Sequence, residues 1–437
     1  MAHHTTSRWT VLLTSGGLLA ATALASAAAN AAPVKAPTAA AEGDLVAVDR
    51  APKAGLNAKS RTYSASAVDF DRDGDQDVLI GYHAQTGKLW RNRGAGTYRR
   101  VATSAWPKFN ANGRTIDRHD CAWADVDRNG RPDAYCSTGR FTHNVVKHDR
   151  DNELWLQSRQ GRFREVGTDW RVGDVCGRGR QVTFLDANGD RFPDLFVGND
   201  RPRKGSDPCN KAGNHLPNER SKLYINTGGT GFRHARRYWD FGSGPGTRCA
   251  EVLDFDRDGW DDLLACRPGS KSPRLYRNKR GHGFADVTSK HLLRGRVTDA
   301  VVGDLDGDRD PDLITATPDG FAYHLNNHGR FAPRVWIGSV SAGKGRSVAV
   351  GDADSDGDLD VYGMVGSRGR FNPDDKIWFN DALSFTPLSV PSAGGAADDV
   401  VALNRLGDGR AEFLVLNGAG WGETPPGPVQ LIRVVRQ

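Results

Sequence analysis

Short apolar runs and polar turns alternate along most of the chain and recur in the same order. A unit begins with an alternating stretch such as 63–68 or 346–350, and a short apolar run such as 78–80 follows an acidic turn. A third run contains an aromatic residue, as at Trp90 or Tyr276, and a fourth begins with Tyr or Phe, as at Tyr98 or Phe284. Runs of this length and alternation are typical of β-strands. Each unit therefore predicts four short strands.

A nine-residue acidic segment separates the first and second strands of every unit. The first reads Asp-Phe-Asp-Arg-Asp-Gly-Asp-Gln-Asp at 69–77, and related segments begin at residues 125, 186, 254, 304, 352 and 404. We number them loops 1–7 and count positions from the first residue of each. Their first positions are 56, 61, 68, 50, 48 and 52 residues apart. Four strands repeated at such a period are typical of propeller blades. The sequence predicts an all-β, seven-bladed β-propeller as a single domain over residues 43–437.

The last unit ends at Gln437 after three strands, and the segment 44–49 precedes the first unit. Strand-forming residues dominate this segment, which reads Asp-Leu-Val-Ala-Val-Asp. We expect it to supply the missing fourth strand of the seventh blade. The ring would then be closed by an N-terminal strand and would have no open edge.

The acidic loops favour a metal ion. Without a cation, mutual repulsion and burial would raise the pKa values of four clustered carboxylates and push the loop open. Ca²⁺ takes about six to eight hard oxygen ligands, whereas Mg²⁺ keeps more of its water. An EF-hand needs Glu at position 12, and no loop has one. A solvated acidic turn without metal is the plain alternative, but sixfold recurrence favours about six Ca²⁺ ions.

Side-chain oxygens at positions 1, 3, 5 and 9 and the backbone carbonyl at position 7 are the expected ligands. In loops 1–6 these residues are Asp69, Asp71, Asp73, Asp75, Asp77, Asp125, Asp127, Asn129, Arg131, Asp133, Asp186, Asn188, Asp190, Phe192, Asp194, Asp254, Asp256, Asp258, Trp260, Asp262, Asp304, Asp306, Asp308, Asp310, Asp312, Asp352, Asp354, Asp356, Asp358 and Asp360. Loop 7 has Leu406 at position 3. We therefore expect weak or no metal binding there.

This pattern resembles the FG-GAP/VCBS repeat family, the integrin-α-like propellers, over about residues 43–437. The resemblance implies Ca²⁺ in hairpin loops on one face of a seven-bladed ring. Two loops depart from it, because Arg191 and Arg309 stand where the family usually has Gly at position 6. Both have Gly at position 4 instead, Gly189 and Gly307, which predicts that the tight bend shifts to that position.

Six cysteines, none in a CxxC pattern, predict three disulfides in an exported protein. Cys121 and Cys136 lie four residues before and eleven after the first Asp of loop 2, and Cys249 and Cys266 lie five before and twelve after that of loop 4. Both pairs fit one antiparallel register across the loop. Each should therefore join the two strands beside its loop. By elimination, the third pair is Cys176 and Cys209.

The N-terminus predicts export. An apolar stretch over 9–28 leads to Ala29-Asn-Ala31, a small-x-small cleavage pattern. We assign 1–31 to a signal peptide and 32–42 to a short linker, which predicts a secreted, extracellular protein with no membrane span after cleavage. A membrane anchor is the alternative reading of this stretch. A charged fraction of 26% and 52 glycines exclude a polytopic membrane protein.

The face opposite the acidic loops is the candidate ligand face. Arginines open the first strand of six units: Arg61, Arg118, Arg178, Arg248, Arg296 and Arg346. Guanidinium groups suit sugars that carry carboxylate or sulfate. The plain alternative is that these arginines pair with nearby Asp residues.

Catalytic motifs are scarce. HExxH, GxSxG, phosphate-loop and dinucleotide patterns are absent from the sequence. A basic stripe is also absent, so nucleic acid is not an expected partner. The sequence favours a secreted calcium-binding propeller that acts as a binding or adhesion module, with a glycan or another extracellular ligand, anionic in particular, as its partner. The alternative is an extracellular polysaccharide lyase or hydrolase, with a general base among His143, His148 and His215.

Overall fold

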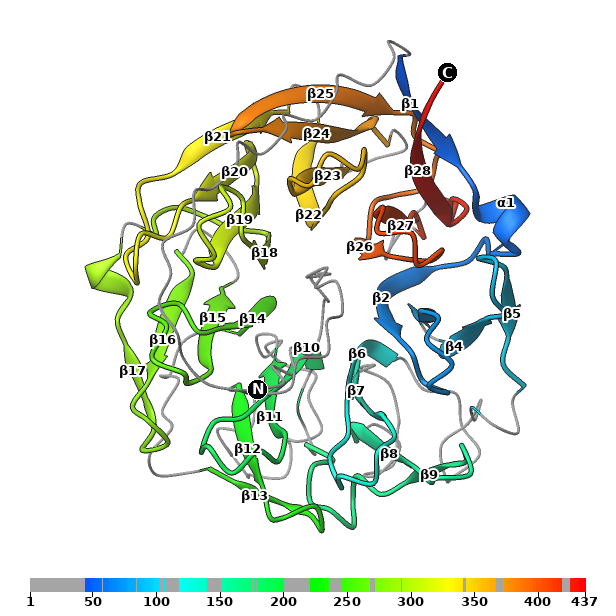
Figure 1. Ribbon diagram of the computed structural model, residues 1–437. Helices are drawn as coiled ribbons and strands as arrows, with labels where there is room; N and C mark the ends of the chain where they lie inside the picture. The colour runs from blue at the N-terminus through cyan, green and yellow to red at the C-terminus, as the bar shows by residue number, and fades with distance from the viewer. Residues whose placement is uncertain are drawn as a thin grey trace, which may run out of the picture.

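Seven four-stranded antiparallel sheets surround a central axis in the computed structural model (Figure 1). The structure describes residues 44–56, 58–83, 85–102, 106, 118–139, 151–174, 177, 179–199, 221–235, 246–267, 272–291, 293–340, 343–366, 372–418 and 425–437. The predicted all-β, seven-bladed propeller is confirmed. Among the described residues, no helix has the length and apolar character that crossing a membrane requires.

Each sheet is formed mainly by consecutive strands, the first innermost. Sheet 1 contains β2 (Thr62–Val68), β3 (Asp77–Tyr82), β4 (Gln85–Asn92) and β5 (Tyr98–Arg100). Sheet 2 contains β6 (Arg118–Ala124), β7 (Asp133–Thr138), β8 (Glu153–Gln157) and β9 (Phe163–Glu165). Sheet 3 contains β10 (Gly179–Leu185), β11 (Asp194–Asn199), β12 (Lys222–Asn226) and β13 (Phe232–His234).

The next three sheets repeat this order. Sheet 4 contains β14 (Cys249–Leu253), β15 (Asp262–Cys266), β16 (Arg274–Asn278) and β17 (Phe284–Asp286). Sheet 5 contains β18 (Asp299–Gly303), β19 (Asp312–Thr317), β20 (Gly320–His324) and β21 (Val335–Ser339). Sheet 6 contains β22 (Lys344–Gly351), β23 (Asp360–Gly366), β24 (Asp375–Asp381) and β25 (Ser384–Val390).

Sheet 7 combines the two ends of the described chain. It contains β26 (Asp399–Leu403), β27 (Glu412–Leu416) and β28 (Gln430–Arg436), and β1 (Leu45–Asp49) is its outermost strand. β1 runs antiparallel to β28, with Leu45 opposite Arg436 (Figure 1). The short helix α1 (Ala51–Ala54) follows β1, and a 3₁₀ turn, η1 (Thr288–Lys290), follows β17.

The core lies between neighbouring sheets. Val78 and Ile80 of β3 pack in one cluster with Leu414 of β27, whereas Leu79 packs in another cluster with residues of sheet 2 such as Trp123. Alternate residues of a second strand thus face opposite neighbours. Both faces of the strand are buried, which explains why the second strands read as continuous apolar runs.

Two of the predicted disulfides are confirmed. Cys121 is bonded to Cys136 and Cys249 to Cys266, and in each pair the residues lie directly opposite each other on the first two strands of the sheet. Cys176 and Cys209 lie outside the described residues.

Candidate metal centre

In loops 1–6, the carboxylate at position 1 accepts backbone N–H groups of its own loop and so fixes the path of the loop around it. In loop 1, Asp69 Oδ1 accepts the backbone N–H of Asp73 at 3.1 Å and Oδ2 that of Gly74 at 3.0 Å. Loops 2 and 4 repeat this pattern. In loops 3, 5 and 6 the first donor is the residue at position 4 instead. Position 1 thus sets the curvature of the loop before any ligand is considered.

Positions 4 and 6 are both left-handed in all seven loops. In loop 1 they are Arg72 and Gly74, with φ of 63° and 92°, and in loop 3 they are Gly189 and Arg191, with φ of 78° and 67°. The expected shift of the bend in loops 3 and 5 is therefore wrong, because the bend always uses both positions. One Gly per loop suffices in loops 1–6, and an Arg or Ser at the other position bears a cost of about 1 kcal/mol.

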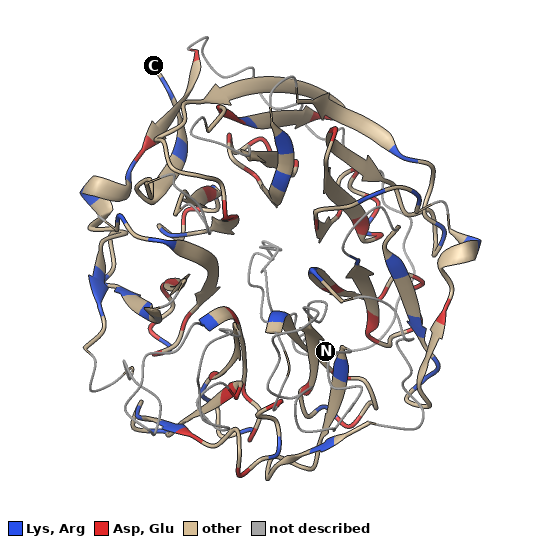
Figure 2. Ribbon diagram, turned by 180° about the vertical axis from the view of Figure 1, so that it is seen from behind, with Lys and Arg blue, Asp and Glu red and all other residues tan. Residues whose placement is uncertain are grey.

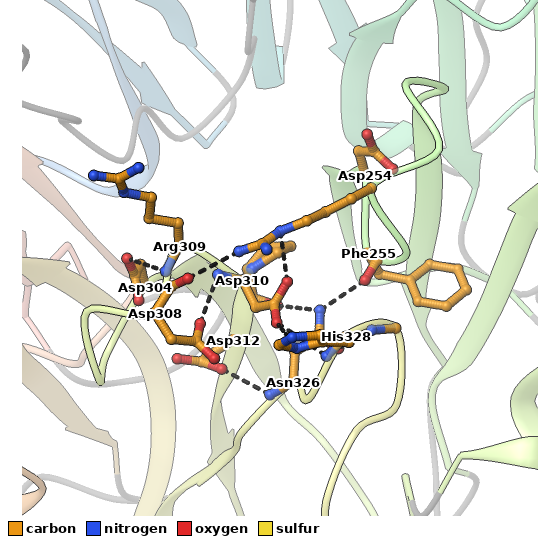
Figure 3. Close-up of polar contacts among 12 residues, drawn as sticks. Asp254, Phe255, Asp304, Asp308, Arg309, Asp310, Asp312, Asn326 and His328 are labelled. Atoms are coloured by element: carbon orange, nitrogen blue, oxygen red, sulfur yellow. Dashed lines mark hydrogen bonds and ion pairs between the residues drawn. The ribbon is translucent and has the colours of Figure 1, made fainter. Parts of the chain in front are cut away.

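Position 9 holds a buried carboxylate that joins three segments of its blade. Asp312 Oδ2 accepts the N–H of Leu305 at 2.8 Å. Its Oδ1 accepts the N–H of Asn326, which follows the third strand, at 2.7 Å (Figure 3). The equivalent residues of the other metal loops, Asp77, Asp133, Asp194, Asp262 and Asp360, make the same two bonds. Position 9 is therefore structural even without a metal.

In five blades, an Asn at or just after the end of the third strand is hydrogen-bonded to the preceding blade. Asn326 Nδ2 donates to the carbonyl oxygen of Phe255, at position 2 of loop 4, at 2.8 Å (Figure 3). Asn92, Asn226, Asn278 and Asn380 make the corresponding bond. The sequence analysis missed these residues as part of the centre. Their signal is an Asn two or three residues after the aromatic residue of the third strand in five units.

Side chains at positions 4 and 7 connect neighbouring loops. Arg131, at position 7 of loop 2, donates to the Asp71 carbonyl oxygen of loop 1 at 2.8 Å. Arg257 of loop 4 forms an ion pair with Asp310 of loop 5, Nε to Oδ1 at 2.7 Å, and His328 Nδ1 lies 3.0 Å from the other oxygen of Asp310 (Figure 3). The variety of side chains at position 7 thus reflects different contacts with the adjacent loop.

The residues present fit a hard cation. Carboxylate oxygens of positions 1, 3 and 9 lie within 4.8 Å of one another in loops 1, 2 and 4, and those of positions 1, 3 and 5 do so in loop 5. Oδ1 of Asp71, Asp256 and Asp354, all at position 3, is buried and has no hydrogen-bond donor among the described residues. Removing a carboxylate oxygen from water without a partner is costly. These oxygens are therefore available as metal ligands.

Three regions, 51–136, 254–315 and 304–363, match the model of the FG-GAP-like repeat. The chain is a seven-bladed propeller of FG-GAP-like repeats. A comparison with functionally curated proteins gives no match.

Two solved structures are similar to this FG-GAP-like propeller at a low level. One is an Agrocybe aegerita lectin described as recognising non-reducing terminal N-acetylglucosamine, with 17% identity and a TM-score of 0.48 over 76% of this chain and 80% of that chain. The other is BBS1N in complex with ARL6DN, with 11% identity and a TM-score of 0.49 over 88% of this chain and 95% of that chain. Likenesses at this level do not bear on the ligand of the propeller.

Loop 7 of the FG-GAP-like propeller contains arginines in place of a full acidic ligand set. Arg405 donates through Nη2 to Glu412 Oε1 at 2.7 Å, and Arg433 Nη2 lies 2.6 Å from Asp408 Oδ2. Leu406, at position 3, is 39% exposed. Guanidinium groups thus neutralise the acidic residues of this loop, which gives a physical reason for the weak metal binding expected there.

The candidate ligand-face arginines have different environments. Arg61, Arg248 and Arg346 are exposed and Arg296 is half-buried, whereas Arg178 lies outside the described residues. Arg118 is fully buried, its Nε lies 2.5 Å from Glu153 Oε2, and its guanidinium lies over the rings of two tryptophans. The assignment of Arg118 to a ligand face is therefore wrong, because an ion pair and indole rings enclose it.

Burial shifts the titration of the position 9 carboxylates. Desolvation raises the pKa of Asp77, Asp133, Asp194, Asp262 and Asp360 from 3.8 to about 8, and that of Asp312 to about 7. A carboxyl group whose pKa is higher in the folded than in the unfolded state stabilises the fold at low pH. This contribution is lost as pH rises through the folded-state pKa. In this propeller the stabilising contribution of the position 9 carboxyl groups is lost between about pH 4 and about pH 8.

The metal-free propeller should therefore become less stable as pH rises from 6 to 8.5. We expect a loss of several degrees in melting temperature across this range in a chelator, measured by differential scanning calorimetry. With excess Ca²⁺ the trend should flatten, since a cation stabilises the ionised carboxylates. Identical slopes with and without Ca²⁺ would contradict this interpretation.

Proposed function

We propose that this propeller is an exported, calcium-loaded binding module for glycans, with a preference for anionic ones. Calcium is supported by the donor set, because the loops supply many carboxylate oxygens and leave the position 3 oxygens without a donor. Export is supported by the two disulfides, which persist in oxidising compartments. The predicted signal peptide lies outside the described residues.

One side-chain cluster carries the glycan part of the proposal. Tyr63 of β2 stacks on His119 of β6 with ring centroids 4.2 Å apart and meets His83 edge-on at 4.6 Å. Arg180 of β10 donates to the Tyr63 hydroxyl, and its guanidinium carbon lies 5.6 Å from the ring centroid. We call these four residues the Tyr63 cluster. Three adjacent sheets contribute to it.

The Tyr63 cluster lies at the end of the ring opposite the acidic loops. Tyr63, His119 and Arg180 stand at the starts of their inner strands, and the acidic loops follow the ends of those strands. Several of the strands that border the axis contain Lys or Arg residues (Figure 2). A guanidinium, two imidazoles and a phenol offer hydrogen-bond donors and positive charge together, which suits carboxylate or sulfate groups on a sugar.

Binding to defined polymers tests this proposal. Polygalacturonate, alginate and heparin should bind in isothermal titration calorimetry, and neutral dextran should not. Arg180→Ala should weaken binding about tenfold, since a charge-assisted hydrogen bond contributes roughly 1.5–3 kcal/mol. Arg233→Ala is the matched control, because Arg233 is exposed on the outer strand β13. Equal binding by wild type and Arg180→Ala would overturn the assignment of this site.

The same cluster supports the second candidate function, a polysaccharide lyase. The Gly179 carbonyl oxygen lies 2.8 Å from His119 Nδ1, and because a carbonyl only accepts, Nδ1 carries the proton of the neutral ring. In β-elimination on a uronate, a base removes the C5 proton, the C4–O bond breaks, a C4=C5 double bond forms, and an acid protonates the leaving oxygen. His119 and Tyr63 suit these two roles.

Ultraviolet absorbance of the unsaturated product separates the two functions. Product formation by the wild type that is lost in Tyr63→Phe and His119→Gln would favour the lyase. Binding without product favours the binding module. The earlier candidates His143, His148 and His215 lie outside the described residues.

A further inference from the structure

One position of the third strand distinguishes the acidic loops from one another. This position comes one residue before the Asn that is hydrogen-bonded to the preceding blade. In sheets 2 and 7 it comes one residue before Gln157 and Val434, which replace that Asn. In sheets 1–7 the residue there is Arg91, Leu156, Ile225, Arg277, Leu325, Phe379 and Arg433. Strand pairing fixes the equivalence, since Val78 pairs with Trp90 and Phe413 with Ile432 at the preceding position. Arginine thus occupies this position beside loops 1, 4 and 7.

Both arginines beside metal loops bind the same two ligand positions. Arg91 Nε lies 2.5 Å from Asp71 Oδ2 and its Nη2 2.9 Å from Asp73 Oδ2. Arg277 Nε lies 2.5 Å from Asp256 Oδ2 and its Nη2 3.0 Å from Asp258 Oδ2. Positions 3 and 5 of loops 1 and 4 are therefore engaged by a guanidinium of their own blade.

The other metal loops have an apolar side chain at this position. Leu156 and Ile225 are buried, and Leu325 and Phe379 are partly buried. None of these side chains can neutralise a carboxylate. Loops 2, 3, 5 and 6 therefore have no cation at the place from which Arg91 and Arg277 act.

We infer that the metal loops form two affinity classes, because Arg91 and Arg277 are built-in cations that compete with the metal in loops 1 and 4. This inference rests on the proposed calcium binding. In these loops a metal competes with the guanidinium for the carboxylates of positions 3 and 5, whereas in loops 2, 3, 5 and 6 the third strand supplies no such competitor. Both arginines are partly exposed, at 49% and 43% of the side chain, so the competition is moderate. Competition from two partly exposed ion pairs corresponds to about tenfold weaker binding.

Calorimetric titration of the chelator-treated full chain with CaCl₂ tests the two classes. The wild type should give a biphasic isotherm, with loops 2, 3, 5 and 6 filling before loops 1 and 4. In Arg91→Leu/Arg277→Leu the weak class should tighten about tenfold and merge with the tight class. Arg93→Leu is the charge control, because Arg93 is exposed two residues after Arg91 and, among the described residues, forms no ion pair with loop 1. It should leave the isotherm unchanged.

The reverse substitution keeps the inference falsifiable if the double variant folds poorly. Leu325→Arg should move loop 5 from the tight to the weak class. A single class in the wild type, or a biphasic isotherm that Arg91→Leu/Arg277→Leu leaves unchanged, would overturn the inference while calcium binding stands. No binding heat from any variant and no change in melting temperature would overturn the proposed calcium binding and the inference together.

Discussion

Removal of Ca²⁺ should lower the melting temperature of the propeller by about 10–20 °C. Each loop contributes RT ln(1 + [L]/Kd), which is roughly 3–4 kcal/mol when free Ca²⁺ is 100–1,000 times Kd. The contribution is large because position 3 oxygens that lack a donor gain a partner when the ion binds. Thermal unfolding of the same protein in EGTA and in excess CaCl₂ measures the difference in melting temperature.

The chelation result has a clear control. Excess MgCl₂ should restore little of the lost stability, since Mg²⁺ sheds its water reluctantly and the loops offer many protein oxygens. An unchanged melting temperature in EGTA would contradict metal binding by these loops. Full rescue by Mg²⁺ would instead contradict the assignment of Ca²⁺.

Asp360→Ala should destabilise the propeller by about 3–5 kcal/mol even in a chelator. Asp360 is fully buried and accepts the backbone N–H groups of Ala353 and Asn380 at 2.7 and 2.9 Å. The substitution leaves both donors without an acceptor, and each costs roughly 1–3 kcal/mol. Urea unfolding in EGTA measures the loss.

Asp356→Ala is the matched control for Asp360→Ala. Asp356 is exposed at position 5 of the same loop, and among the described residues its Oδ1 accepts just one hydrogen bond, from the N–H of Asp358 at position 7. Its removal should cost less than about 1 kcal/mol in EGTA but should lower Ca²⁺ affinity. Equal destabilisation by the two substitutions in EGTA would show that position 9 has no structural role beyond that of a ligand.

The repeat made the fold predictable from sequence. Four strand-like runs and an acidic segment recur in six units, and the seventh unit repeats all but the fourth run, so the number of blades follows from a count. Register across a hairpin is also local, and for this reason the pairings Cys121–Cys136 and Cys249–Cys266 could be predicted. Position 9 was recognised as an acidic residue, but its two backbone contacts depend on a third strand that the loop sequence does not specify.

Features that depend on neighbouring blades could not be predicted. The partner of Asn326 is a carbonyl 71 residues earlier in the chain, and the Tyr63 cluster joins three inner strands. Arg118 was predicted to face a ligand, and only the packing shows the tryptophans and Glu153 that enclose it. Left-handed conformations at Arg191 and Arg309 were missed because Gly, not Arg, is the usual signal for them.

Most of the hydrogen bonds that these Asn side chains make between blades connect a later blade to an earlier one. This order bears on how the chain folds as it leaves the ribosome. Asn226, Asn278, Asn326 and Asn380 each reach back to a blade that has been synthesised earlier. Each of these blades can therefore secure its predecessor as soon as its own third strand emerges. Asn92 is the exception, because its acceptor, the Arg405 carbonyl oxygen, lies 313 residues later. The nascent propeller would thus remain an open arc until the seventh blade, which supplies the acceptor of Asn92, has been synthesised.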